Sequence, residues 1–374
     1  MGSVYAIVGF LALIVFVVIP IHELGHMLVA RHFGFKVTEY FVGFGPKLWS
    51  RKPHEIEYGF KAIPAGGYVK IAGMNPYESV APEDLPRAYG SKPIWQRALV
   101  IIAGPLSHFL LGALMFLVLF ATYGDANTDV VVAGEVAPTL ANHPSPAAEA
   151  GMQPGDVVLR VGDLENPTPD ALGRYVTRYA QEHPGEPLEY VIERDGRRFT
   201  LPIVPQLVTE GGVTKGRIGF TLGAEPLSVP EAAVVSVRYV GATAWNAVTT
   251  IPRIFTEGVG RTLSVLFSDE PRRADDPTSL WGVSRQVGDA GDRGDWGTFL
   301  AYAGYVTIFI GIVNLIPLPP LDGGHLALLL WEKLTGRQVD YRKLVPVSAA
   351  VIVFLSIFAL ATVFLDITEP LPVI

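Results

Sequence analysis

The sequence His22-Glu23-Leu24-Gly25-His26 combines residue types that can bind a metal ion and move a proton. On a helix the two histidines point to one face, where both imidazoles can bind one zinc ion while Glu23 acts as the general base. So short a pattern also occurs by chance. The alternative is that the two histidines merely lie at the end of a helix and that Glu23 extends its carboxylate to water. Its position favours the metal site, because ionisable side chains at the end of an uncharged membrane span are costly and are by default functional.

A catalytic zinc ion usually has three protein ligands, and Asp322 is the candidate for the third. It directly follows the proline-rich stretch 314–321 and is the only carboxylate between residues 296 and 325. A buried helix end tolerates a carboxylate poorly unless it is paired or metal-bound. The prolines break a helix and free backbone carbonyls, which suits a cavity wall. A helix cap after the proline turn is the alternative, but beside the two histidines we interpret Asp322 as a ligand and expect one Zn²⁺ per chain.

The composition places these residues in a membrane protein. Of the 374 residues 17% are charged and 49% are hydrophobic, whereas soluble domains average about 25% charged residues. The chain has no cysteine, which excludes disulfides, cysteine-ligated zinc, iron–sulfur clusters and a cysteine nucleophile. A net charge of −7 and dispersed basic residues argue against a nucleic-acid partner.

Four stretches without charged residues are long enough to cross a bilayer, which needs about 17–25 apolar residues. They are Val4–Ile21, Ala98–Tyr123, Trp296–Leu321 and Leu344–Leu365. The first lacks the basic region and the cleavage site of a signal peptide, so it is predicted to be retained. The shorter run Tyr239–Pro252 is predicted to form an amphipathic helix at the membrane surface.

Charge placement orients the spans, because loops rich in lysine and arginine stay in the cytoplasm. The loop Arg31–Arg97 has ten basic and six acidic residues, and the segment Glu332–Lys343 has four and two. The segment Gly124–Asp295 has fifteen basic and twenty-four acidic residues. We therefore expect both termini and the long segment outside, and the zinc site toward the cytoplasm.

The cytoplasmic loop is predicted to be rich in β-structure. In Glu55–Ile63 apolar and polar residues alternate, as in a half-buried strand. The turn Ala65-Gly66-Gly67 precedes a second short strand, Tyr68–Ile71. An open strand edge cannot face lipid, but it can lie over a wet cavity lined by protein.

The outer segment contains a compact β-rich domain from about Thr128 to Val208, with one helix at Asp170–Ala180. Residues 145–159, Ser-Pro-Ala-Ala-Glu-Ala-Gly-Met-Gln-Pro-Gly-Asp-Val-Val-Leu, resemble the loop and strand of a bacterial PDZ domain. Such a domain accepts a peptide or a C-terminus by strand addition. Any small β-rich domain with a Pro-Gly-Asp turn is the alternative.

Taken together, the motifs resemble the site-2 protease family of intramembrane zinc metalloproteases, and they occur in that family's order. The likeness is strongest to bacterial members with four spans and one PDZ domain, which cleave anti-sigma factors. The motifs are His22–His26, Gly43–Pro46, Pro64–Lys70, Ala103–Pro105, the PDZ pattern and Asn314 to Gly324.

The resemblance implies a fold and a set of roles. The fold is a multi-pass α-helical protein of the bacterial cell membrane, with a membrane-associated cytoplasmic β-rich loop and one extracytoplasmic PDZ domain. The expected parts are residues 1–30 and 98–123 (first two spans), 31–97 (β-loop), 128–208 (PDZ), 209–295 (connector), 296–325 (third span) and 344–365 (fourth span). His22, His26 and Asp322 would bind zinc, Glu23 would be the base, and Asn314 would hold the substrate backbone. The β-loop, around Gly66, Gly67 and Tyr68, would pair with unwound substrate.

His108 departs from the family pattern, in which asparagine is common. It could hydrogen-bond, contact the cavity or pack between helices, and we favour the hydrogen-bonding role. His32 and His325 fit no expected ligand position and are interpreted as structural.

The expected substrates are single-span membrane proteins such as anti-sigma factors, cleaved after a first cut outside. Two other functions fit parts of the pattern: a catalytically idle scaffold that binds peptides through its PDZ domain, and a divalent-metal transporter. A retained Glu23 argues against the scaffold. Candidate ligands that converge at one membrane end argue against the transporter.

Overall fold

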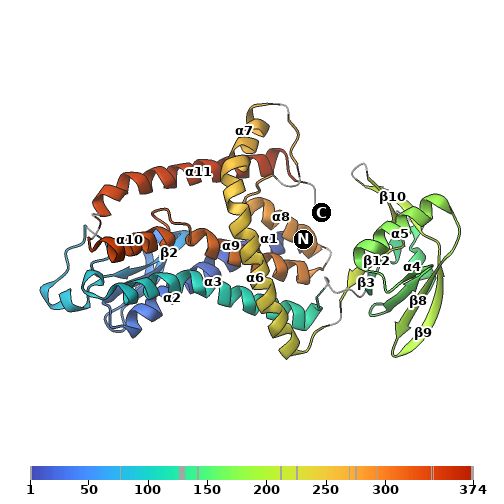
Figure 1. The fold of residues 1–374 in the computed structure, drawn as a ribbon, viewed down its shortest axis with the longest axis horizontal. Helices are drawn as coiled ribbons and strands as arrows, with labels where there is room; N and C mark the ends of the chain where they lie inside the picture. Colours follow the sequence, from blue (N-terminus) through green and yellow to red (C-terminus); the bar gives the residue numbers. More distant parts are fainter. Residues whose placement is uncertain are drawn as a thin grey trace. The chain divides into compact units, whose positions relative to one another are not determined.

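The computed structural model describes residues 2–75, 77–125, 131–140, 143–210, 213–224, 226–268, 270–273, 276–292, 294–337, 339 and 341–371. It divides into two compact units, Met1–Phe116 with Ser236–Ile374, and Leu117–Val235 (Figure 1). The predicted domain start at Thr128 lies outside the described residues.

Among the described residues, four helical segments are long and apolar enough to cross a membrane: Ser3–His32, Ile94–Tyr123, Trp296–Asn314 and Arg342–Thr368. They confirm the four predicted apolar helices. The first consists of α1 (Gly2–Leu13), a π-helical turn (Ile14–Val18) and α2 (Ile19–His32); the others are α3 (Ile94–Tyr123), α9 (Trp296–Asn314), and α11 (Val345–Thr368) with the 3₁₀ turn Tyr341–Leu344 before it.

Two helical segments differ from the sequence prediction. The third span was expected to run to residue 325, but α9 ends at Asn314 because three prolines follow, and α10 (Asp322–Thr335) begins as a separate helix. The expected surface helix Tyr239–Pro252 lies inside the longer α6 (Val229–Arg253), which is not among the four candidate spans. The remaining helices are the π-helical turn Ile254–Gly258, α7 (Val259–Phe267), α8 (Leu280–Asp292), and the 3₁₀ turns Pro82–Arg87 and Tyr89–Ser91.

Apolar side chains of α1, α3, α8, α9 and the π-helical turn form one of the apolar cores of the first unit. α1 packs against α8 and α9, and its phenylalanine Phe10 is fully buried. The residues of this core are Ala6, Phe10, Ile14, Val18, Met115, Val287 and Ala303. Because α1 leads without a break into α2, this core anchors the helix that carries the two candidate zinc ligands.

Strands β1 (Val37–Arg51) and β2 (Glu57–Ile71) form an antiparallel sheet that packs against α2 (Figure 1). The first half of β1 pairs on both sides, since Tyr40 lies opposite Tyr58 and also opposite Val69. Residues 67–71 therefore form an outer edge of this sheet. In the described part of the chain no other strand pairs with that edge.

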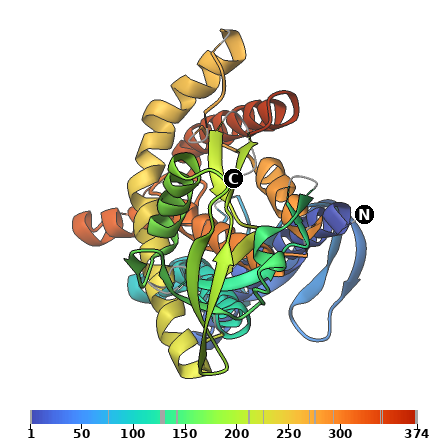
Figure 2. The same ribbon diagram turned by 90° about the vertical axis from the view of Figure 1, so that its right-hand side faces the viewer.

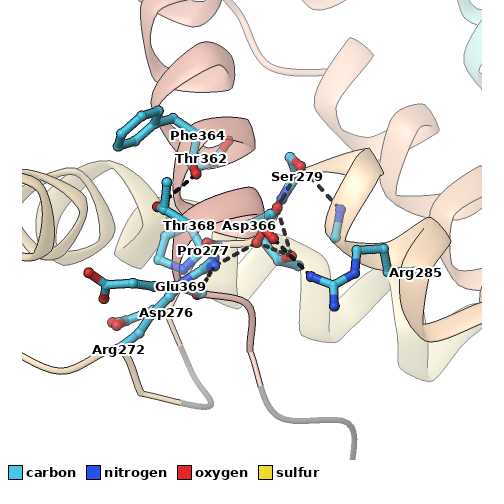
Figure 3. A network of polar contacts seen from close by, with 12 residues as sticks. Arg272, Asp276, Pro277, Ser279, Arg285, Thr362, Phe364, Asp366, Thr368 and Glu369 are labelled. Atoms are coloured by element: carbon cyan, nitrogen blue, oxygen red, sulfur yellow. Dashed lines mark hydrogen bonds and ion pairs between the residues drawn. The ribbon is translucent and has the colours of Figure 1, made fainter. Parts of the chain in front are cut away.

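A cluster of buried polar groups joins the end of α11 to the segment before α8 (Figure 3). Asp366 is 1% exposed and accepts hydrogen bonds from the backbone and hydroxyl of Ser279, at 2.7 and 2.5 Å, and from Thr278. Arg272 lies 2.7 Å from the same carboxylate, and Arg285 donates to the Asp366 carbonyl. We call these five residues the Asp366 cluster.

The second unit contains an antiparallel sheet with strand order β12-β3-β6-β8-β9, and the short β7 pairs with β6 (Figures 1 and 2). The helix α5 (Pro169–Glu182) covers the predicted helix at 170–180, and its Leu172 and Val176 pack on the sheet. The strands are β3 (Val131–Val136), β6 (Val157–Val161), β7 (Leu164–Glu165), β8 (Leu188–Arg194), β9 (Arg197–Ile203) and β12 (Phe220–Gly223). Outside this sheet lie β4 (Thr139–Leu140), β5 (His143–Pro144), α4 (Pro146–Glu149), β10 (Gln206–Glu210) and β11 (Val213–Arg217).

The sheet extends past Val208, where the sequence interpretation ends the domain. β12 pairs with β3, from Phe220 opposite Val136 to Gly223 opposite Val132. β12 has only four residues, Phe220 to Gly223, and Gly219 precedes it, so its alternation is too short to be recognised as a strand from the sequence.

Candidate metal centre

His22 and His26 lie on one face of α2, one helical turn apart, and both are buried. Their Nε2 atoms are 3.1 Å apart. The π-helical turn just before them has a local cause: Pro20 cannot donate to the carbonyl of Phe16, and its ring crowds that carbonyl, so the helix widens.

Asp322 joins the two histidines from the first residue of α10. Its Oδ2 lies 3.3 Å from Nε2 of His22 and 3.4 Å from Nε2 of His26. Two atoms bound to one zinc ion at about 2.05 Å in tetrahedral geometry lie about 3.3 Å apart. The spacing of the three atoms thus fits a zinc ion, and these residues form a possible metal-binding group in the described chain.

Glycines bring α3 close to the two histidines. A Cβ atom at Gly104 would lie 2.3 Å from Nε2 of His26 and 2.7 Å from Cε1 of His22. A Cβ at Gly25 would lie 2.4 Å from the carbonyl oxygen of Ala103. The contact between α2 and α3 therefore requires glycine on both helices at the level of the site.

The loop before α10 places Asp322. A Cβ at Gly323 would lie 2.2 Å from the Leu315 carbonyl oxygen, and one at Gly324 would lie 2.5 Å from the Pro319 nitrogen. The loop 315–321 thus folds tightly onto the first turn of α10. The carboxylate also lies at a helix N-terminus, where the helix dipole favours negative charge.

The backbone of α3 orients one of the histidines. Nδ1 of His26 lies 2.8 Å from the carbonyl oxygen of Val100. If Nδ1 carries the proton and donates to this carbonyl, Nε2 is left free to bind a metal. The sequence analysis missed Val100, and no signal points to it, because every residue has a carbonyl.

Glu23 lies beside the three ligand candidates in a cavity of about 240 Å³. Asn314, the last residue of α9, and Tyr68 of β2 also line this cavity. The full lining is His22, Glu23, His26, Tyr68, Val69, Ile71, Met74, Val100, Ile101, Asn314, Pro320, Leu321 and Asp322.

The glycine-rich part of β2 approaches the site closely. A Cβ at Gly67 would lie 3.2 Å from Cγ of Glu23, so this strand lies directly against the candidate base. Tyr68 donates a 2.5 Å hydrogen bond to Glu39 of β1. Gly66, with φ +149°, lies against the Phe44 ring and lines neither this cavity nor the next one.

A second cavity, of about 490 Å³, adjoins the first. The two share Tyr68, Val69, Ile71, Met74 and Pro320. Residues of α10 and α11, among them His325, Leu328 and Val345, line its other side. The outer edge of β2 therefore faces a continuous hollow that leads from the three ligand candidates.

His108 lies on α3 and is 1% exposed. Its ring centroid is 5.0 Å from that of His22, yet it lines neither cavity and is not in the metal-binding group. His32 is exposed at the end of α2, and His325 lines the second cavity. Neither belongs to the metal-binding group.

Two imidazole nitrogens and one carboxylate oxygen fit three ligand positions of a zinc ion and leave the fourth for water. A glutamate beside such a centre is placed to take a proton from that water. This combination suits metal-assisted hydrolysis.

The chain matches the family model described as Peptidase family M50 over residues 10–359. It is 33% identical to zinc metalloprotease Rip1 of Mycobacterium tuberculosis, over 96% of each chain. It is also 33% identical to the putative zinc metalloprotease R01501 of Rhizobium meliloti, over 90% of this chain and 89% of the relative. Metalloprotease MmpA of Caulobacter vibrioides is 29% identical over 89% of each chain.

Proposed function

The chain belongs to peptidase family M50, the site-2 proteases, and is a zinc metalloprotease; on that premise we propose that it hydrolyses peptide bonds within or near the transmembrane segment of single-span membrane proteins. The observation that carries the proposal is the convergence of His22, His26 and Asp322 beside Glu23. The two histidines and Glu23 lie in the first half of α2, within a helical segment that is long and apolar enough to cross a membrane.

We assign His22, His26 and Asp322 as the zinc ligands and expect one ion per chain. When bound, zinc would polarise the scissile carbonyl and make water a nucleophile near neutral pH. Glu23 takes the proton of the attacking water and passes it to the nitrogen of the leaving amine. The carbonyl of Val100 holds the ring of His26. This ligand therefore keeps its orientation during the reaction.

The substrate must unwind before it can react, because a transmembrane helix holds its carbonyls in bonds between residues i and i−4. Among the described residues, no further strand pairs with the edge of β2 at residues 67–71, and Tyr68, Val69 and Ile71 of this edge line both adjoining cavities. A substrate segment added as a strand there would recover the lost hydrogen bonds. Gly67 has no side chain between that strand and Glu23, and Tyr68 follows it on the same edge. We propose that Gly66, just before this edge, allows the turn of the chain that leads into it.

Asn314, at the end of α9, lines the same cavity as Tyr68 and Val69 of β2. Its side-chain amide can both donate to and accept from a peptide backbone. We assign it to hold the substrate backbone against the β2 edge.

We assign the second unit as a PDZ domain outside the membrane, with both chain ends on the same side and the zinc site toward the cytoplasm. The charge counts of the loops and the Pro-Gly-Asp sequence at 154–156 support this assignment. Its groove would accept a peptide or a C-terminus, and the domain would admit only substrates already trimmed outside. Anti-sigma factors that have received a first cut are the substrates we propose.

The test is cleavage of a single-span membrane protein by purified enzyme in detergent. Glu23→Gln keeps the side chain's shape and removes the base, so it should retain zinc and lose about 10²–10⁴-fold in activity. Glu83→Gln, at an exposed glutamate of the 3₁₀ turn Pro82–Arg87, is the matched control and should behave as wild type. Near-normal turnover by Glu23→Gln would mean that the base lies elsewhere. A wild-type protein that holds zinc but cleaves no substrate would support the idle scaffold.

A further inference from the structure

His108 is a buried polar side chain without a protein partner. It lies inside the apolar helix α3, and among the described residues neither of its ring nitrogens has a hydrogen bond. A buried polar group without a hydrogen-bond partner destabilises the folded protein. Such a residue in the middle of an apolar helix needs a compensating role.

Among the described residues, the ring of His108 lies beside that of His22, which also lacks a hydrogen-bond partner at one nitrogen. The two ring centroids are 5.0 Å apart, with an angle of 42° between the planes. Nδ1 of His22 is also buried and has no hydrogen-bond partner in the described part of the chain. A Cβ at Gly311 would lie 2.8 Å from Cβ of His108, so α9 packs closely against this residue.

The two histidine ligands are supported unequally. His26 has the Val100 carbonyl at its Nδ1, whereas His22 has no equivalent protein acceptor. Metal-binding histidines almost always donate their second N–H to an oxygen acceptor or a water, which fixes the tautomer and the direction of the ring. The ring of His108 packs against that of His22, so His108 is a polar side chain close enough to support it.

We propose that His108 is a positioning residue that orients His22 through a hydrogen-bonded link to Nδ1. We infer that one bridging water makes this link, because two consecutive hydrogen bonds of about 2.8 Å can join ring nitrogens of imidazoles whose centroids are 5.0 Å apart. The water accepts the Nδ1 proton of His22 and donates to a ring nitrogen of His108. Nε2 of His22 then keeps its lone pair for zinc.

This inference rests on the proposed zinc site and predicts a property separate from turnover. Loss of such a link costs about 10–100-fold in metal affinity. His108 lines neither cavity, so its effect should reach the substrate only through the metal ligand.

The experiment measures zinc affinity of the full-length protein in detergent by competition with a chromogenic chelator. His108→Leu removes the polar atoms and should weaken zinc binding by about 10–100-fold. His108→Asn keeps a donor and an acceptor and should restore affinity to within about threefold of wild type. Thr307→Val is the matched control, because Thr307 is a buried polar residue of α9 that contacts Met115 rather than the site.

A second readout uses cobalt in place of zinc. The visible spectrum of the bound cobalt reports ligand geometry, so it should change in His108→Leu and return in His108→Asn. If His108→Leu fails to fold, His108→Phe gives the same comparison with a ring of similar shape.

Two results would overturn the inference. One is wild-type zinc affinity in His108→Leu. The other is an equal loss of affinity in the leucine and asparagine variants, which would make His108 a packing residue. A wild-type protein that binds no zinc would instead overturn the proposed metal site itself, so the two failures are distinguishable.

Discussion

The Asp366 cluster and the candidate metal centre are both buried groups of charged and polar side chains, but only one of them is satisfied by the protein. The Asp366 carboxylate accepts bonds from a backbone amide and two hydroxyls and is paired with Arg272. Within the described residues, the Nε of Arg272 is the one buried side-chain nitrogen or oxygen of that cluster without a hydrogen bond. At the metal centre, Nδ1 of His22 and both ring nitrogens of His108 have none.

This difference separates two uses of buried polarity. Buried polar groups are normally hydrogen-bonded, and each exception needs an explanation. The hydrogen bonds and the ion pair of the Asp366 cluster hold α11 to the segment before α8. The nitrogens without a hydrogen bond belong to His22 and His108, beside the three ligand atoms whose spacing fits zinc. We infer that their partners come from outside the chain, as water beside a bound metal ion, rather than from other side chains.

The largest effect should follow from removing a zinc ligand. His22→Ala or Asp322→Ala should reduce zinc from about one ion per chain to near zero and abolish cleavage, because two ligands cannot hold the ion. Metal analysis of purified protein measures this. His32→Ala, at an exposed histidine of the same helix, should keep both zinc and activity.

The same variants test whether the bound metal stabilises the folded protein. Chelation should lower the melting temperature of the wild type, because a ligand that binds only the folded state stabilises it by mass action. Chelation should leave Asp322→Ala unchanged. Full zinc occupancy in Asp322→Ala would remove this residue from the site.

The second prediction places the two clusters on opposite sides of the membrane. The chain has no cysteine, so single cysteines can be introduced as labels. Glu369, three residues after Asp366, and Glu83, in the β-loop, are both exposed and would each be changed to cysteine. A membrane-impermeant thiol reagent added to intact cells should label position 369 strongly and position 83 only after the cells are opened. Equal labelling at both positions would contradict the orientation inferred from the loop charges.

The third prediction concerns the satisfied cluster. Asp366→Asn leaves Arg272, whose side chain is 4% exposed, as a buried charge without its counter-ion. Losing one member of a buried ion pair costs about 3–5 kcal/mol, so thermal unfolding should show a clear loss of stability while zinc content stays normal. Asp163→Asn, at an exposed aspartate, is the control. Loss of zinc from a folded Asp366→Asn variant would mean that zinc binding depends on the Asp366 cluster, and it would contradict the separation of the two sites.

The candidate metal centre was more predictable from the sequence than the Asp366 cluster, because its residue types and their setting indicate chemistry by themselves. His22 and His26 are four residues apart, so helix geometry alone places them together. Asp322 was identified because a carboxylate beside a membrane span needs a partner. The prolines also indicated where α9 stops, although the end at Asn314 came only with the structure.

Features that depend on packing between distant segments were not predictable. Asp366 comes directly after the apolar stretch that ends at Leu365, and its partners lie about 90 residues earlier in a segment without periodicity. The support from Val100, the glycine contacts of α3 and the pairing of β12 with β3 likewise depend on tertiary contacts. His108 stood out only as an unexpected residue type, and its ring neighbour could not be inferred.

The smallest effect should come from an exposed pair of the same chemical type as Arg272 and Asp366. Glu55 accepts two hydrogen bonds from Arg87, at 2.8 and 2.9 Å, and one from Lys36 at 3.1 Å. The bonds from Arg87, and then those from Lys36, lower the pKa of Glu55 to about 2. Because the Glu55 side chain is 40% exposed, solvent screens the interaction and its contribution to stability should stay below about 1 kcal/mol.

The sign of the pH dependence follows from that lowered pKa. The folded protein holds the charged form of Glu55 more tightly than the unfolded chain, so the stabilisation is complete above the ordinary pKa of about 4.5 and is lost as the pH falls toward 2. Glu55→Gln should therefore be slightly less stable than wild type at pH 7, and the difference should shrink between pH 4.5 and 2 and also in high salt. Chemical unfolding of both proteins at several pH values measures this, with Glu83→Gln as the control. A difference that persists at pH 2 would mean that Glu55 stabilises the β-loop by packing rather than by charge.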